Sequence, residues 1–265
     1  SQCRIHLWVL QLHPTTTHST AKNIDHYAIH QFPVICYAAG KSFEVTRMLV
    51  EAGASLMPAV GWDALQQATY PGCLDTLKYL YAQWKLANVD KNKDYVMPVE
   101  TEDLVFQAAT HGDVPILEYA LEITGLSPSV MNEQLTGLVH MAASNGNLAI
   151  VQWLHETHKL PLDTIEYSHL GTPLIIAASS GNIELVEYIC NRTQPDFTVM
   201  LASGATFLHH AARRSLVLVK MFYENCPQAQ DYTNLYTDEE KTPLMLATIK
   251  NQLDIVQYLI NEQHA

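Results

Sequence analysis

The chain has 265 residues, of which 48% are hydrophobic and 16% are charged, a composition typical of a soluble globular protein. Asp and Glu together number 27 and Lys and Arg 15, so the formal net charge is −12. This acidic excess argues against a nucleic-acid-binding surface, because such a surface needs clustered Lys and Arg.

The sequence carries no pattern typical of a membrane span or of a disulfide framework. The apolar segment near the N-terminus, residues 5–20, is interrupted by polar residues and by Pro14, so we expect neither a transmembrane helix nor a signal peptide. The five cysteines are odd in number, lie far apart and form no CxxC pair. We interpret them as free thiols in a reducing compartment, which predicts a cytoplasmic location.

Residues 1–28 differ in composition from the rest of the chain. Residues 4–12 are mostly apolar without helical spacing, and a turn-prone stretch around Pro14 follows. Two interpretations compete: a cap over the exposed end of the repeats described next, or the tail of an upstream domain. We favour a cap within a fragment of a longer protein. A degenerate extra repeat has no support, because the signature of the repeats is missing here.

From residue 29 onward one pattern recurs: an alanine, a small residue, and a glycine or small polar residue four positions after the alanine. Its copies lie 30, 40, 34, 35, 34 and 36 residues apart, with their first alanines at Ala38, Ala68, Ala108, Ala142, Ala177, Ala211 and Ala247. Such a period predicts a solenoid, in which each unit stacks on the next because it cannot bury its apolar face alone.

Residue types within each unit predict how its helices begin and end. Thr172 and Thr242 each precede a proline, so we expect them to cap helices that begin at the proline. In four units a glycine is expected to end the first helix in a left-handed conformation: Gly72, Gly112, Gly146 and Gly181. In the weaker units small polar residues replace it: Ser42, Ser215 and Asn251. We expect irregular turns at the two serines, where the alignment lacks one residue.

The second helix of each unit carries a bulky residue at a constant place: Met48, Tyr79, Tyr119, Trp153, Tyr188, Met221 and Tyr258. Such a row has two interpretations, an aromatic ladder that stacks a ligand or simple packing between neighbouring helices. We favour packing, because the spacing places the row on one apolar helix stripe.

The best-preserved unit begins Thr172-Pro173-Leu174-Ile175-Ile176-Ala177-Ala178 and continues into a second amphipathic helix. It resembles an ankyrin repeat, whose pattern is Thr-Pro-Leu-His-x-Ala at a period of about 33 residues. The resemblance covers residues 29–265 as about seven degenerate repeats. It implies an all-α ankyrin-repeat solenoid of stacked helix-turn-helix units with short hairpin finger loops. His140 and His209 match the family's histidine, which ties neighbouring loops together by hydrogen bonds.

The 40-residue spacing between Ala68 and Ala108 reveals an insertion, which we place at residues 84–99. Insertions in solenoids form loops on one face, and that face is often the binding one. The insertion is therefore either a longer solvated loop, which we favour, or a contact for a specific partner.

Motifs for catalysis, cofactors and metals are missing from the sequence. It contains no GxSxG, HExxH, glycine-rich phosphate loop or CxxC pair. The adjacent His209 and His210 do not make a zinc site by themselves, because zinc needs three or four convergent ligands. We expect no cofactor, no metal and no enzyme within these residues.

The resemblance implies a binding surface made of finger tips and the exposed ends of the inner helices. The finger positions are Trp62, Glu100, Glu102, Glu133, His169, Asp238 and Glu239. The inner-helix positions that we select are Tyr70, His111, Asn145, Arg213, Arg214 and Lys250. Trp62 and Tyr70 are the expected anchors, because Trp, Tyr and Arg dominate hot spots. Acidic fingers beside a basic group on the last two inner helices would match a partner with a charge gradient.

These observations predict a monomeric protein-interaction module that binds a partner protein, without catalysis and without nucleic-acid or membrane binding. The main alternative is the substrate-recruiting part of a larger enzyme or bacterial effector, which would act in the host cytosol or nucleus. Self-assembly through uncapped ends is disfavoured by the large negative charge.

Overall fold

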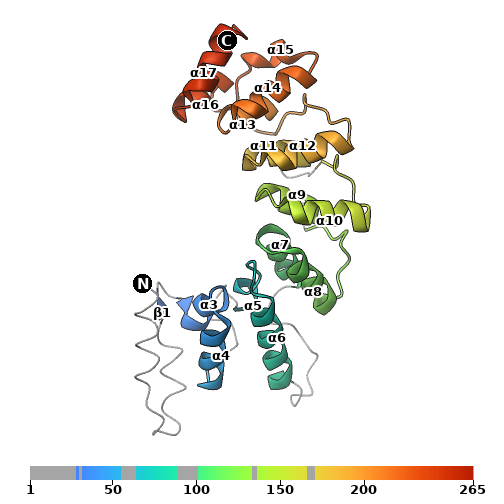
Figure 1. Ribbon diagram of the computed structural model, residues 1–265, viewed down its shortest axis with the longest axis vertical. Helices are drawn as coiled ribbons and strands as arrows, with labels where there is room; N and C mark the ends of the chain where they lie inside the picture. The colour runs from blue at the N-terminus through green and yellow to red at the C-terminus, as the bar shows by residue number, and fades with distance from the viewer. Residues whose placement is uncertain are drawn as a thin grey trace. The chain divides into compact units, whose positions relative to one another are not determined.

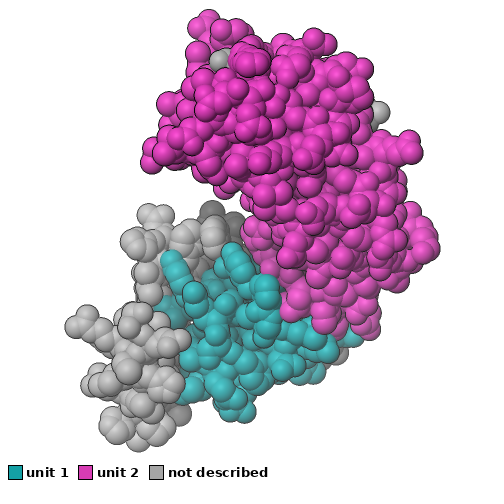
Figure 2. Space-filling view, turned by 45° about the horizontal axis from the view of Figure 1, so that its top comes forward, with its two compact units in different colours: residues 1–100 teal, residues 101–265 magenta. Residues whose placement is uncertain are grey.

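The computed structural model describes residues 28–29, 32–54, 64–88, 101–132, 136–165 and 171–264. The chain divides into two compact units, Ser1–Glu100 and Thr101–Ala265 (Figure 2). Apart from one two-stranded hairpin and two isolated bridges, the regular structure of the described residues is helical. The predicted all-α fold is therefore confirmed.

The first unit contains a short antiparallel hairpin and two pairs of helices. Strand β1 pairs with β2, helix α3 packs against α4 and α5, and α6 packs against α4 and α5. Their bounds are β1 Ala28–Ile29, β2 Phe32–Pro33, α3 Val34–Ala39, α4 Phe43–Glu51, α5 Ala64–Gln67 and α6 Leu74–Asn88. This unit thus holds two adjacent helix-turn-helix pairs.

The second unit contains five successive helix pairs, drawn from green to red in Figure 1. The first helices of the pairs contact one another in chain order and form an inner layer, and the second helices form an outer layer. The inner helices are α7 Thr101–His111, α9 Leu138–Ser144, α11 Pro173–Ser180, α13 Phe207–Ala212 and α16 Pro243–Ile249. The outer helices are α8 Val114–Thr124, α10 Leu148–His158, α12 Ile183–Arg192, α14 Leu216–Asn225 and α17 Leu253–Asn261.

Loops and one extra helix connect these pairs. The short helix α15 (Ala229–Thr233) follows α14 and was not predicted. Its Thr233 is buried, and the hydroxyl groups of Tyr223 and Thr233 lie 2.8 Å apart. Between α8 and α9, and between α12 and α13, single antiparallel bridges close hairpin loops, as expected for finger loops.

The predicted helix starts are confirmed. Thr172 and Thr242 have extended backbones, and their hydroxyls accept hydrogen bonds from the backbone N–H groups of Ile175 and Met245. Each cap is followed by proline, which loses no hydrogen bond at a first helical position. All seven signature alanines are buried, which lets the helices of each pair approach closely.

The turns after the inner helices follow the glycine prediction with one exception. A left-handed conformation occurs at Gly72, Gly146 and Gly181, and at Asn251 (φ 56°). Gly112 does not adopt a positive φ, so this prediction is wrong. Helix α7 runs to His111, and the chain passes directly into the extended Asp113, which caps α8.

The two serine turns differ from the glycine turns in a regular way. Ser42 and Ser215 have extended backbones, with φ of −156° and −157°, and each is itself the N-cap of the following outer helix. Their hydroxyls accept hydrogen bonds from the N–H groups of Val45 and Val217. These two turns are one residue shorter than the glycine turns, because the serine that caps the outer helix occupies the position of the left-handed glycine.

The bulky residues of the outer helices mainly contact the preceding outer helix. The ring centroids of Tyr79 and Phe43 lie 5.6 Å apart, and those of Tyr258 and Tyr223 lie 6.0 Å apart, both edge to face. Tyr188 is buried and donates to the carboxylate of Glu156 in α10. These contacts support the packing interpretation, although Met48 is exposed.

The proposed insertion begins later than predicted. Helix α6 continues to Asn88, so residues 84–88 are helical, and Trp84 is only 3% exposed. Trp84 follows the buried Leu77 and Leu80 by seven and four residues, which places all three on one helix face. Residues 89–99 of the insertion, and residues 1–27, lie outside the described part of the chain.

Candidate functional site

Two histidines connect inner helices to the loops of the next repeat. The Nδ1 atom of His209 accepts from the N–H of Thr206, and its Nε2 donates to the carbonyl of Leu235 at 3.1 Å. The Nε2 atom of His140 donates to the carbonyl of Thr164 at 2.9 Å. The predicted loop-tying role of these histidines is confirmed. Burial lowers the pKa of His209, although its hydrogen bond to the carbonyl of Leu235 acts in the opposite direction.

Two asparagines make a second connection between repeats that sequence reasoning missed. Asn147 Nδ2 donates to the carbonyl of Gly112 at 2.8 Å, and Asn182 Nδ2 donates to that of Gly146 at 2.7 Å. Each also caps its own outer helix through Oδ1. The available signal was an asparagine directly after a turn glycine, in Gly146-Asn147 and Gly181-Asn182. Each asparagine contacts the carbonyl of the equivalent glycine one repeat earlier.

The last two fingers share one hairpin geometry. In one, the N–H of Leu201 donates to the carbonyl of Ala205; in the other, the N–H of Thr237 donates to the carbonyl of Lys241. Gly204 (φ 73°) and Glu240 (φ 56°) take the same left-handed place in the two turns. The N–H of Asp238 donates to the carbonyl of Ser203 at 2.9 Å, so the fingers also contact each other.

Several predicted binding residues cannot be compared with the structure. Outside the described residues lie Trp62, Glu100, Glu133 and His169. Tyr70 belongs to the first unit, follows α5 and is 42% exposed.

Glu102 lies in the first turn of α7, so its placement in a finger is wrong. An acidic residue there stabilises the start of the helix through its dipole.

The remaining predicted residues lie at the ends of inner helices and at a finger tip. His111 ends α7 and is half-buried. Asn145 is exposed but donates to the carbonyl of Thr110 at 3.0 Å, so it also links two repeats. The other members of the set are exposed: Arg213, Arg214, Asp238, Glu239 and Lys250. We call the finger tips and inner-helix ends of the second unit the inner surface.

Opposite charges meet on the inner surface around Arg213. The Lys241 ammonium, which hydrogen-bonds to the Glu239 carboxylate, holds the pKa of that carboxyl below its usual range, and Arg213 contributes in the same direction. The side chain of Gln252 donates to the carbonyl of Arg213, which links this turn to the next repeat. The predicted acidic finger and basic helix end are therefore neighbours in space.

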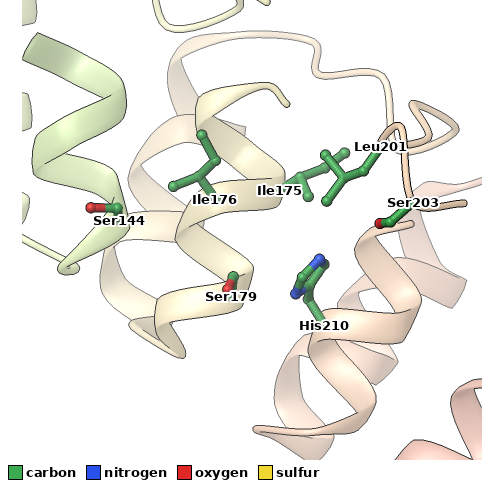
Figure 3. A pocket seen from close by; sticks show the side chains of 7 residues that line it. All are labelled: Ser144, Ile175, Ile176, Ser179, Leu201, Ser203 and His210. Atoms are coloured by element: carbon green, nitrogen blue, oxygen red, sulfur yellow. The ribbon is translucent and has the colours of Figure 1, made fainter. Parts of the chain in front are cut away.

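A pocket of about 200 Å³ opens between α11, α13 and the finger before α13 (Figure 3). Ile175, Ile176 and Leu201 supply its apolar lining, and three serines and one histidine supply its polar groups. The histidine is His210, whose ring projects from α13 toward the finger (Figure 3). The serines are Ser144, Ser179 and Ser203. Sequence reasoning missed this pocket, although it noted His210.

His210 is neutral at physiological pH. Burial lowers its pKa from 6.5 to about 4, and the nearby charge of Arg213 acts in the same direction. Its buried Nε2 atom has no hydrogen-bond partner among the described residues. An uncharged imidazole therefore lines the pocket beside hydroxyl groups.

The comparison with protein families identifies the repeats. The family model described as ankyrin repeats, in three copies, matches residues 105–200 and 194–265. The chain belongs to the ankyrin-repeat family. The match begins within α7, so the ankyrin identity of the two helix pairs in the first unit stays a prediction. No curated protein matches the chain.

Ankyrin repeats are in general protein-interaction modules, and the match contains no catalytic domain. Among the described residues of this ankyrin chain, no three His, Cys, Asp or Glu side chains gather where they could hold a metal ion. None of its described helices is both long and apolar enough to span a bilayer. The four cysteines in the described part, Cys36, Cys73, Cys190 and Cys226, are free thiols.

Proposed function

We propose that this chain is a monomeric protein-interaction module that binds a partner protein through its inner surface and has no catalytic activity of its own. The free thiols support a reducing location such as the cytoplasm. In the first unit, the exposed Tyr70 remains a proposed anchor.

The observation that carries this proposal is that some polar side chains bond neighbouring repeats to each other, whereas others are exposed on the inner surface. Three side chains donate hydrogen bonds to carbonyl groups of neighbouring repeats: His140, His209 and Asn182. Arg213 and Arg214 instead stand exposed on the inner surface, beside a finger tip that exposes two acids. Charged groups arranged in this way speed association and set the register of a partner.

The test compares two double variants that change the net charge equally. Arg213→Glu with Arg214→Glu reverses the inner surface, whereas Arg192→Glu with Lys220→Glu reverses two exposed cations of the outer helices. The control breaks the exposed ion pair of Arg192 with Glu156 and the cation–π contacts of Arg192 with Tyr188 and of Lys220 with Tyr258, which contribute little stability at exposed sites.

Each chain is used as bait in cytosolic extract after circular dichroism has shown that it is folded. We expect quantitative mass spectrometry to find a protein that the parent and the outer-helix variant retain and the inner-surface variant loses. Retention of every captured protein by the inner-surface variant would contradict the proposal.

A further inference from the structure

The pocket beside His210 has the size of a site for one side chain. Its volume of about 200 Å³ is below the roughly 300–1,000 Å³ of pockets that hold small molecules or cofactors. It lies on the inner surface and draws its lining from α9, α11, α13 and one finger. Pockets of this kind in protein interfaces receive the anchor residues that dominate binding.

The lining selects the chemistry of that side chain. Ile175, Ile176 and Leu201 offer apolar walls, and the hydroxyl and imidazole groups of the lining offer positions for hydrogen bonds. An aliphatic anchor would cover these polar groups without forming hydrogen bonds to them, which is unfavourable. A Lys or Arg anchor would meet no carboxylate in the lining and would approach Arg213 and Arg214.

Tyrosine combines both requirements, because its ring packs on apolar walls while its hydroxyl both donates and accepts a hydrogen bond. We propose that this pocket binds a tyrosine side chain of the partner protein, with the phenol hydroxyl among the serine hydroxyls and the imidazole of His210 that line it, and with an acidic residue of the partner beside it, facing Arg213 and Arg214. This inference rests on the proposed function, since it specifies which residue of the partner the inner surface receives.

The probe is a phage-displayed library of random twelve-residue peptides, selected on the whole 265-residue chain. We expect the enriched peptides to share a tyrosine flanked by Asp or Glu. In a synthetic copy, replacing that tyrosine by phenylalanine should weaken binding at least tenfold. Selection of peptides that share no tyrosine, or equal binding of the phenylalanine peptide, would overturn the proposal.

Two variants of the chain locate the bound peptide. Ser179→Tyr fills the pocket from its rim and should abolish binding, whereas Ile249→Tyr places the same ring at the equivalent position of the last repeat and should preserve it. His210→Leu should weaken binding at least tenfold. This variant is expected to fold, because Ile176 and Leu246 are aliphatic at the equivalent positions.

The outcomes separate this inference from the proposed function. Binding that survives both Ser179→Tyr and His210→Leu, yet is lost when Arg213 and Arg214 become Glu, would overturn the tyrosine pocket and leave the inner surface as the binding site. Binding lost only in the outer-helix variant of Arg192 and Lys220 would overturn both.

Discussion

The turn residue Gly204 is held in a conformation that other residues rarely adopt. Its φ is 73°, and an added Cβ atom would lie 3.3 Å from Thr237 Cα and from the carbonyl oxygen of Tyr236. Gly204→Ala should therefore lower the free energy of unfolding by about 1–2 kcal/mol, measured by urea denaturation. The matched control is Glu240→Gly at the same place in the next finger, which should not destabilise the chain. Equal stability of Gly204→Ala and the parent would contradict this account.

The buried ring of His210 makes stability depend on pH. The pKa of His210 is about 4 in the folded chain and near 6.5 in the unfolded chain. Between these two pH values the unfolded chain therefore binds a proton at His210 and the folded chain does not. The free energy of unfolding should thus fall between pH 6.5 and 4. From pH 7 to 5 the parent should lose about 2 kcal/mol more than His210→Leu, in which this proton site is missing. Denaturation curves that fall in parallel for the two chains would show that His210 titrates normally.

Asn182 makes two hydrogen bonds, one that caps its own helix and one that joins its repeat to the preceding one. It caps α12 through Oδ1 and donates to the carbonyl of Gly146 through Nδ2. Asn182→Ala removes both bonds and should cost about 2 kcal/mol of unfolding free energy, whereas Asn182→Ser keeps a cap and should cost about 1 kcal/mol. Thermal and urea unfolding measure the difference. If Asn182→Ser costs nothing, the bond to the neighbouring repeat contributes nothing; if both substitutions cost the same, the cap contributes nothing.

How far the elements could be predicted depends on whether the deciding interaction is local. The starts at Thr172 and Thr242 were predictable, because a cap and a proline act within one helical turn. The continuation of α6 through Trp84 was not, since it depends on the burial of that ring in the folded chain. The pocket beside His210 was also beyond prediction, because three repeats must be stacked before its lining comes together.

At the scale of the whole molecule, the second unit consists of helix pairs that each contact mainly their neighbours. Stability in such arrays is approximately a sum over repeats and their interfaces. A chain reduced to residues 101–265, the second compact unit, should therefore keep a helical circular dichroism spectrum and a cooperative urea transition. A spectrum typical of an unfolded chain would show that this unit depends on residues 1–100.

The central claim is that a partner protein binds the inner surface, and amide hydrogen exchange tests it most directly. The 265-residue chain would be measured alone and with the protein captured in the charge-reversal experiment. The account predicts slower exchange on binding in the fingers at residues 200–206 and 236–241 and in the turn that contains Arg213 and Arg214. Slower exchange confined to the outer helices α10, α12 and α14 would contradict it.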